Sequence, residues 1–137
     1  LAAEAGLAWA QYNLGHILLS GDGAPRDRDA AFAWYMRAAS QGHERAMNLV
    51  ARCFEEGWGV ARDMAAARNW YRKSAAGGYF RGAYNYASLL ARDGCVTGAA
   101  IWFRRALADA PRSTRELMAR TLRENSEPRL RALADFK

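Results

Sequence analysis

The sequence is poor in the residues that several kinds of site require. Its 137 residues include only two cysteines and two histidines. Two cysteines do not make a disulfide framework, and His16 and His43 form no helical His-x-x-x-His pair that would hold zinc. No apolar run approaches the roughly 18 residues that a membrane-spanning helix needs. The sequence therefore predicts no metal site, no disulfide scaffold and no membrane span.

Composition and charge leave more classes of protein open. The length fits one compact unit, and the chain is 51% hydrophobic, with much alanine that suits closely packed helices. The net charge of +6 comes almost entirely from arginines that are scattered along the chain and interleaved with acids. Arginine binds phosphate and carboxylate equally well. A nucleic-acid-binding surface thus remains an alternative to a surface for acidic protein partners.

A period of 36 residues is the most informative pattern in the chain. Gly6, Gly42 and Gly78 recur at this spacing, and each is expected to close an alanine-rich helix and open the next. Other positions recur in the same register: Ala10 and Ala46, Gly15, Ala51 and Ala87, and Trp34 and Trp70. A period of roughly 20–50 residues is typical of solenoids, which usually present a binding surface rather than a catalytic centre.

Each repeat is predicted to contain two helices, A and B. Apolar residues with a period of 3.6 place the A helix between the repeat glycine and a second glycine, which is suited to end the helix in the left-handed conformation. These second glycines are Gly21, Gly57 and Gly94. The B helices are expected at about 28–40 and 64–76, with Asp27 and Asp63 as N-caps, and a third B helix contains Trp102.

The five tryptophans divide into two predicted environments. Trp34, Trp70 and Trp102 have small residues one turn away on either side, so we expect them to be buried between repeats. On this interpretation Trp70→Ala costs about 3–5 kcal/mol. Trp9 and Trp58 fit no recurrent position and are expected to be exposed, where aromatic residues often serve in binding.

The repeat pattern is incomplete at both ends of the chain. Residues 1–6 resemble the last turns of later B helices, so the chain is expected to be a monomeric fragment that begins inside a repeat. Repeats are placed at about 7–42, 43–78 and 79–110. Beyond them, Ser113 and Glu116 predict a capping box for a helix over roughly 113–124, and Pro128 predicts a short helix that ends near residue 136. Residues 111–137 thus form a predicted helical cap.

One motif runs through the first repeat: Ala10-x-Tyr12-x-Leu14-Gly15, then Gly21-x-Gly23, Asp27, Ala31, Trp34, Ala38-Ala39 and Gly42. This motif resembles the Sel1-like repeat, a relative of the tetratricopeptide repeat. A second copy continues through Gly57-Trp58-Gly59-Val60, Asp63, Ala67, Trp70, Ala75 and Gly78. The resemblance implies an all-α, right-handed α-solenoid of antiparallel helix pairs. It also implies an adaptor or scaffold for protein complexes, often in bacterial signalling or envelope processes. The sequence does not favour either compartment, the bacterial cytoplasm or the periplasm.

Catalytic interpretations of the sequence are weaker. The glycine pairs 21/23 and 57/59 lack the preceding strand and the Gly-Lys-Ser/Thr ending of a phosphate-binding loop. Cys53 and His16 could meet across adjacent A helices, but Cys53 lies on the packing stripe and nothing beside it predicts a reactive thiolate. We therefore expect a protein that is not an enzyme and that uses no cofactor.

The expected binding surface is the concave groove lined by the A helices, by analogy with tetratricopeptide repeats. Its aromatic, amide and guanidinium groups suit an extended peptide whose backbone is held by asparagine and whose carboxylates meet arginine. A merely solvated inner face, or a basic structural protein of the cell envelope, remains an alternative. The predicted groove residues are Trp9, Tyr12, His16, Arg45, Asn48, Arg52, Arg81, Tyr84, Ser88 and Arg92.

Overall fold

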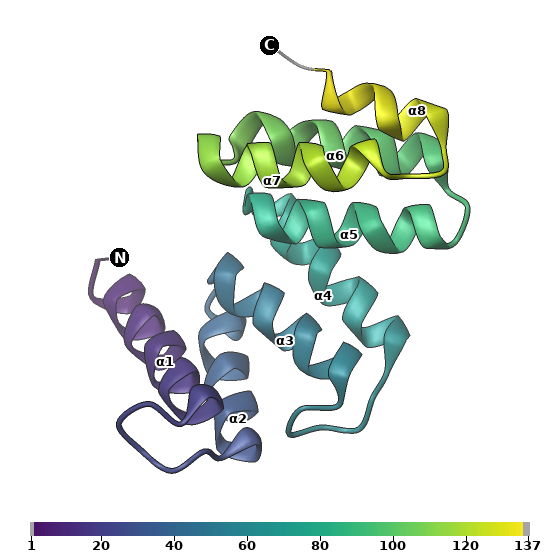
Figure 1. Cartoon of the computed structure of the whole chain (residues 1–137). Helices are drawn as coiled ribbons and strands as arrows, with labels where there is room; N and C mark the ends of the chain where they lie inside the picture. Colours follow the sequence, from purple (N-terminus) through teal and green to yellow (C-terminus); the bar gives the residue numbers. More distant parts are fainter. Residues whose placement is uncertain (1, 136–137) are drawn as a thin grey trace.

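The computed structural model describes the backbone of residues 2–135 and the side chains of residues 5–135. Within these residues the protein is entirely helical (Figure 1). The elements are α1 (Ala2–Ser20), α2 (Arg28–Ser40), α3 (Glu44–Glu56), α4 (Met64–Ala76), α5 (Phe80–Arg92), α6 (Val96–Asp109), α7 (Arg112–Arg123), α8 (Pro128–Arg131) and the 3₁₀ helix η1 (Ala132–Ala134).

The helices pack as consecutive pairs. The pairs α1/α2, α3/α4 and α5/α6 correspond to the predicted A and B helices. The B helices α2 and α4 also contact the A helix that follows each of them. The helix α3 additionally contacts α5, whereas α7, α8 and η1 pack together at the C-terminal end of the array (Figure 1). No helix of the described residues is both long and apolar enough to cross a bilayer.

The loop chemistry within each pair confirms the predicted helix ends. Gly21, Gly57 and Gly94 all have positive φ angles, between 76° and 83°. Asp27 and Asp63 accept hydrogen bonds from Ala30 and Ala66, at 3.0 and 3.1 Å, and so cap the N-termini of α2 and α4.

Two predicted boundaries are wrong. The helix α1 runs without interruption through Gly6, where the repeat pattern predicted a helix end, so the first repeat glycine lies inside a helix. Pro111, not Ser113, is the N-cap of α7, and no side chain caps that helix. The bounds of α7 nevertheless agree with the prediction to within one residue.

The register of the B helices differs from the prediction by one residue. The fully buried aromatic residues are Tyr35, Tyr71 and Phe103, each of which follows a tryptophan. A step of one residue turns a side chain by about 100° on a helix, so Trp34, Trp70 and Trp102 are only half-buried at the edge of the interface. A cation lies over each of these three rings: Arg37, Lys73 and Arg105, at 4.5, 4.5 and 5.1 Å from the centroids.

The other two tryptophans also differ from each other. Trp9 is 44% exposed, as predicted. Trp58 is half-buried and packs against the core between Arg28 and Arg52, so its predicted exposure is wrong.

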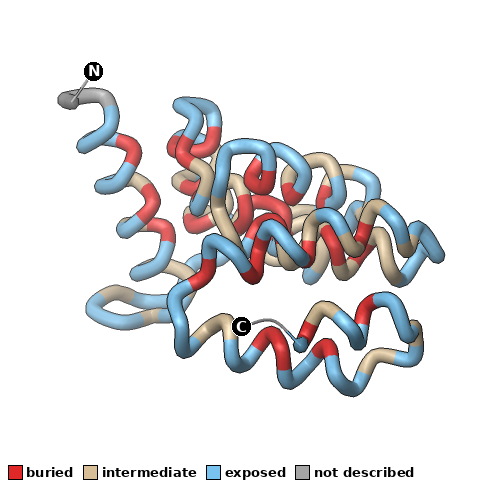
Figure 2. Tube along the Cα trace, turned by 90° about the horizontal axis from the view of Figure 1, so that it is seen from above, coloured by how far each residue is buried: buried red, intermediate tan, exposed pale blue. Residues whose placement is uncertain are grey.

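The first A helix is less covered than the second. Ala46 and Cys53 on α3 are fully buried beneath α2, whereas their repeat equivalents Ala10 and Ile17 on α1 are exposed. Figure 2 shows exposed turns along this helix next to its buried ones. Among residues 2–135, no helix packs on α1 in the place that α2 occupies on α3.

Candidate functional site

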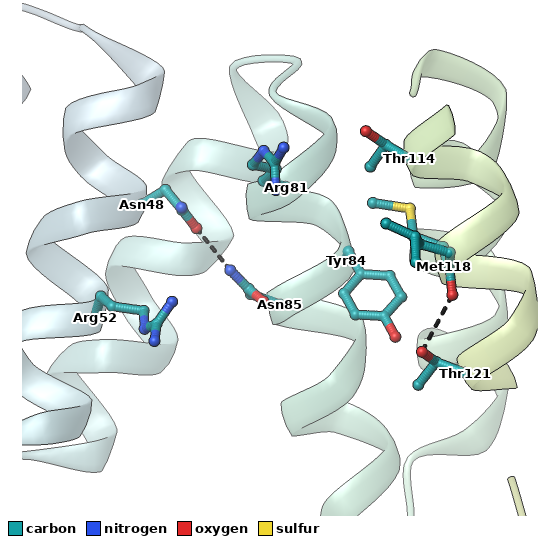
Figure 3. A pocket seen from close by; sticks show the side chains of 9 residues that line it. Asn48, Arg52, Arg81, Tyr84, Asn85, Thr114, Met118 and Thr121 are labelled. Atoms are coloured by element: carbon teal, nitrogen blue, oxygen red, sulfur yellow. Dashed lines mark hydrogen bonds between the residues drawn. The ribbon is translucent and has the colours of Figure 1, made fainter. Parts of the chain in front are cut away.

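A pocket of about 290 Å³ lies between the A helices and the C-terminal cap. Figure 3 shows that α3, α5 and α7 supply its walls, with Tyr84 directed from α5 towards α7. We call it the α3/α5/α7 pocket, and its lining residues are Asn48, Arg52, Arg81, Tyr84, Asn85, Thr114, Leu117, Met118 and Thr121.

A pair of amides joins two walls of this pocket. Asn48 is buried on α3, and its side-chain oxygen accepts a hydrogen bond of 2.9 Å from the Asn85 amide of α5. The bond satisfies a buried polar group that would otherwise be costly. It also links two A helices from successive repeats.

Two arginines give the pocket a positive charge. Arg52 and Arg81 are exposed, and neither forms a salt bridge with a carboxylate within residues 5–135. Arg52 lies 5.4 Å from the centroid of Trp58, and Arg81 lies 5.3 Å from that of Phe80, so each guanidinium rests against an aromatic ring. Together with the amides and the threonine hydroxyls, they make the pocket rich in hydrogen-bond donors.

Tyr84 separates this pocket from a second one. The second pocket, of about 500 Å³, shares Tyr84 and Thr121 with the first and adds Ser88 and Arg92. The Tyr84 ring packs edge-to-face on Phe103 at 5.2 Å. Burial raises the pKa of Tyr84, although a hydrogen bond with Thr121 partly opposes this change, so the phenol is protonated at neutral pH. Two hollows thus adjoin along the contact between α5 and α7.

The predicted groove residues of α1, which are Trp9, Tyr12 and His16, belong to a separate aromatic cluster. Tyr12 is buried, and its ring contacts those of Trp9, His16, Tyr35 and His43, with centroids 4.5–6.0 Å away. Because Tyr12 is buried in this packing, it serves the core more than the groove surface.

The two histidines have structural partners in this cluster. Nδ1 of His16 lies 3.1 Å from the Tyr35 hydroxyl, and Nδ1 of His43 accepts the Ala46 amide at 3.2 Å. Burial lowers the pKa of both rings.

The structure therefore divides the predicted groove residues. Six of the ten line the two adjoining pockets: Asn48, Arg52, Arg81, Tyr84, Ser88 and Arg92. Trp9 lines a smaller pocket of about 230 Å³ at the other end of the array. Tyr12, His16 and Arg45 line none of these three pockets.

Five residues of the α3/α5/α7 pocket were not predicted from the sequence. Asn85 follows Tyr84 directly, so the helical pattern could have included it. The four residues from α7 lie outside the repeat register, and nothing in the sequence indicated which helix α7 would face. These four are Thr114, Leu117, Met118 and Thr121.

Groups for metal or nucleophilic chemistry are not gathered at these pockets. No group of three or more His, Cys, Asp or Glu side chains that could hold a metal occurs in the described part of the chain. Burial raises the pKa of the Cys53 thiol to about 12, so the thiol is protonated at neutral pH. The α3/α5/α7 pocket offers hydrogen-bond donors for carboxylate or carbonyl oxygens and an apolar edge from Leu117 and Met118.

Comparison with protein families identifies the repeat. The family model described as Sel1 repeat matches residues 10–43 and 44–79, which together make up about half of the chain. Among curated proteins, the chitin synthase regulator SKT5 of Malassezia restricta is 49% identical over 45 residues. That match covers 33% of this chain and 3% of the regulator.

Two solved structures are similar in fold. The Sel1 repeat protein from Oxalobacter formigenes has a TM-score of 0.71 and 24% identity, over 85% of this chain and 50% of that one. A protective antigen of uropathogenic Escherichia coli strains, which displays an SLR fold, has a TM-score of 0.77 and 23% identity, over 97% and 30%. The chain thus spans half or less of the length of these proteins.

Proposed function

This chain belongs to the Sel1 repeat family, and on that premise we propose that it is a non-enzymatic protein-interaction module whose α3/α5/α7 pocket binds an acidic segment of a partner protein. Repeats of this kind generally mediate protein interactions. The residues that bind, and the preference for acidic groups, are our proposal.

One observation carries the proposal. Arg52 and Arg81 line the same pocket, and neither forms a salt bridge with a carboxylate of the described chain. Guanidinium groups bind carboxylates through paired, charge-assisted hydrogen bonds. Asn48 and Asn85 line the same pocket, and we assign to the peptide backbone the amide groups that they do not use on each other. A carboxylate from a partner would complete this set of groups.

A charge-reversal experiment tests the proposal. The probe is a fluorescein-labelled dodecapeptide made of four Glu-Ser-Leu units, and its binding is followed by fluorescence anisotropy. Arg52→Glu combined with Arg81→Glu should abolish binding while helical circular dichroism and melting remain unchanged. The control combines Arg26→Glu with Arg62→Glu, which makes the same charge change on two exposed loop residues. If both double variants lose the same amount of peptide affinity, the loss comes from net charge alone, and the proposed site is overturned.

The charge of the B helices supports a second candidate, which is nucleic-acid binding. The sequences of α2, α4 and α6 contain seven Arg or Lys residues and two Asp residues. A polyanion bound there would lose affinity steeply with salt, because neutralised phosphates release counterions. A gel shift at about 50 mM and about 200 mM salt tests this candidate. Strong binding that disappears at the higher concentration would favour nucleic acid over the peptide.

A further inference from the structure

Arg45 is held between aromatic rings from two other repeats. Its guanidinium carbon lies 5.3 Å from the ring centroid of Trp9 on α1 and 5.2 Å from that of Tyr79, which precedes α5. Burial raises the pKa of the neighbouring Tyr12, and the positive charge of Arg45 opposes this rise. Stacking against rings restricts a guanidinium group but leaves its in-plane N–H groups able to bind a carboxylate in a paired geometry.

The cation has no acidic partner within residues 5–135. No salt bridge involves Arg45 there. The side-chain carbons of the adjacent Glu44 lie against Gly77 at the end of α4, where an added Cβ would collide with them. An exposed arginine that is stacked between two rings and has no carboxylate partner among residues 5–135 is suited to bind a carboxylate from a partner protein.

Tyr79 connects this stack to the α3/α5/α7 pocket. Its ring contacts Arg45. Burial raises the pKa of Tyr79, and the nearby charge of Arg81, which lines that pocket, opposes the rise. The two arginines hold equivalent repeat positions, each three residues after its repeat glycine. The stack and the pocket therefore belong to one continuous surface across α3 and α5.

A partly apolar contact surface adjoins the stack. Trp9 is 44% exposed and lines the pocket of about 230 Å³. The other lining residues are Ala5, Ala8 and Gly42 and the polar residues Gln41, His43 and Glu44. Trp, Tyr and Arg are the residue types that most often dominate the energy of protein interfaces. This combination suits an acidic residue that is followed or preceded by an apolar one.

We propose that Trp9, Arg45 and Tyr79 form a second anchor, which binds another acidic side chain of the same partner segment. The segment is then extended and carries at least two acidic residues, one for each anchor, with an apolar side chain beside the one at Arg45. The proposal rests on the proposed function, because it takes the α3/α5/α7 pocket as the first anchor. It defines the partner by a pattern of charge and apolar residues.

Peptide length separates the two anchors experimentally. The probes are the fluorescein-labelled dodecapeptide and a labelled single Glu-Ser-Leu tripeptide, which can occupy one anchor only. Arg45→Gln should weaken dodecapeptide binding about tenfold, the scale of one charge-assisted contact, and should leave tripeptide binding at the first anchor unchanged. Arg62→Gln, an exposed loop arginine, is the charge-matched control and should change neither affinity.

A second set of variants keeps the charge and changes only the stack. Trp9→Leu should weaken binding of the dodecapeptide. Trp9→Phe should restore part of the lost affinity, because a ring face is again present. Dodecapeptide affinity that is unchanged by Arg45→Gln would overturn the second anchor while leaving the first intact. If binding also survives Arg52→Glu with Arg81→Glu, the proposed function itself fails, so the two failures are distinguishable.

Discussion

The side-chain amide of Asn85 on α5 donates a hydrogen bond to the side-chain oxygen of Asn48 on α3, at 2.9 Å. Asn48 is only 6% exposed, so loss of its partner would strand a buried polar group. We expect Asn85→Ala to lower the free energy of unfolding by about 1–3 kcal/mol. Adding Asn48→Ala should cost less than its own separate effect, because both partners are then absent. Urea denaturation of the two single variants and the double variant measures this coupling, and strict additivity would contradict it.

Two helical glycines are predicted to respond in opposite ways to alanine. Gly6 lies inside α1 with nothing within 4 Å of an added Cβ, so Gly6→Ala should stabilise the protein by roughly 0.5–1 kcal/mol through helix propensity. At Gly82 an added Cβ would collide with the Ser74 side chain of α4. Gly82→Ala should therefore lower the melting temperature despite the same gain in propensity. Thermal unfolding by circular dichroism compares them, and a shift of the same sign in both would contradict the packing described.

The neighbouring aromatic residues Tyr71 and Trp70 give a test of the B-helix register. Tyr71 is 1% exposed and donates a 2.7 Å hydrogen bond to Glu55, whereas Trp70 is half-buried beneath Lys73. Tyr71→Ala should cost about 3–5 kcal/mol, as for other buried aromatic truncations. Trp70→Ala should cost less than Tyr71→Ala in the same urea titration. The reverse order would show that the tryptophan holds the buried position.

The N-cap of α3 should make stability depend on pH. Nδ1 of His43 accepts the Ala46 amide only while it is unprotonated, and burial lowers the pKa of His43 from 6.5. Glu44 opposes this shift and Arg45 adds to it. Because the unfolded chain takes up the proton first, the free energy of unfolding should fall as the pH drops from about 7.5 to about 5.

His43→Asn is the matched variant for this pH dependence, since asparagine caps helices and does not titrate. Both proteins should carry His16→Gln, because burial also lowers the pKa of His16. As the pH falls across this range, the melting temperature should then drop less for His43→Asn than for its parent. Equal slopes of melting temperature against pH would mean that His43 does not contribute to the pH dependence.

The two thiols should differ in reactivity. Cys95 is exposed, whereas Cys53 is buried with a pKa raised to about 12. At about pH 8 a disulfide reagent that releases thionitrobenzoate should label Cys95 rapidly, and Cys53 only after urea unfolding. Cys95→Ser should remove the rapid phase. A rapid phase that persists in this variant would show that Cys53 is accessible.

The 36-residue period was sufficient to predict the helix pairs, because caps such as Asp27 and terminal glycines such as Gly57 act through local backbone chemistry. It did not settle which of two adjacent aromatic residues, Trp34 or Tyr35, is buried. Small residues flank both of them, and the choice depends on the helix rotation that packing sets. Periodicity favoured the tryptophan, but Tyr35 is the residue that meets Gly15 across the helix pair.

The residues of the candidate pocket could be predicted only in part, for a related reason. Repeat register identified Arg52, Arg81 and Tyr84 as residues of the inner face, and these line the pocket. The opposite wall comes from α7, including Thr121, and this helix lies outside the repeats. Its position depends on tertiary contacts with α6 and η1 that no local pattern encodes.

In the proposed complex the partner segment lies across α3, α5 and α7. Nuclear magnetic resonance of the ¹⁵N-labelled protein, titrated with the Glu-Ser-Leu dodecapeptide, locates the segment residue by residue. The largest amide and side-chain shifts should occur at Asn48, Asn85 and Thr121, around the pocket. Shifts confined to the B helices, or to the glycine loops after α1 and α3, would contradict it.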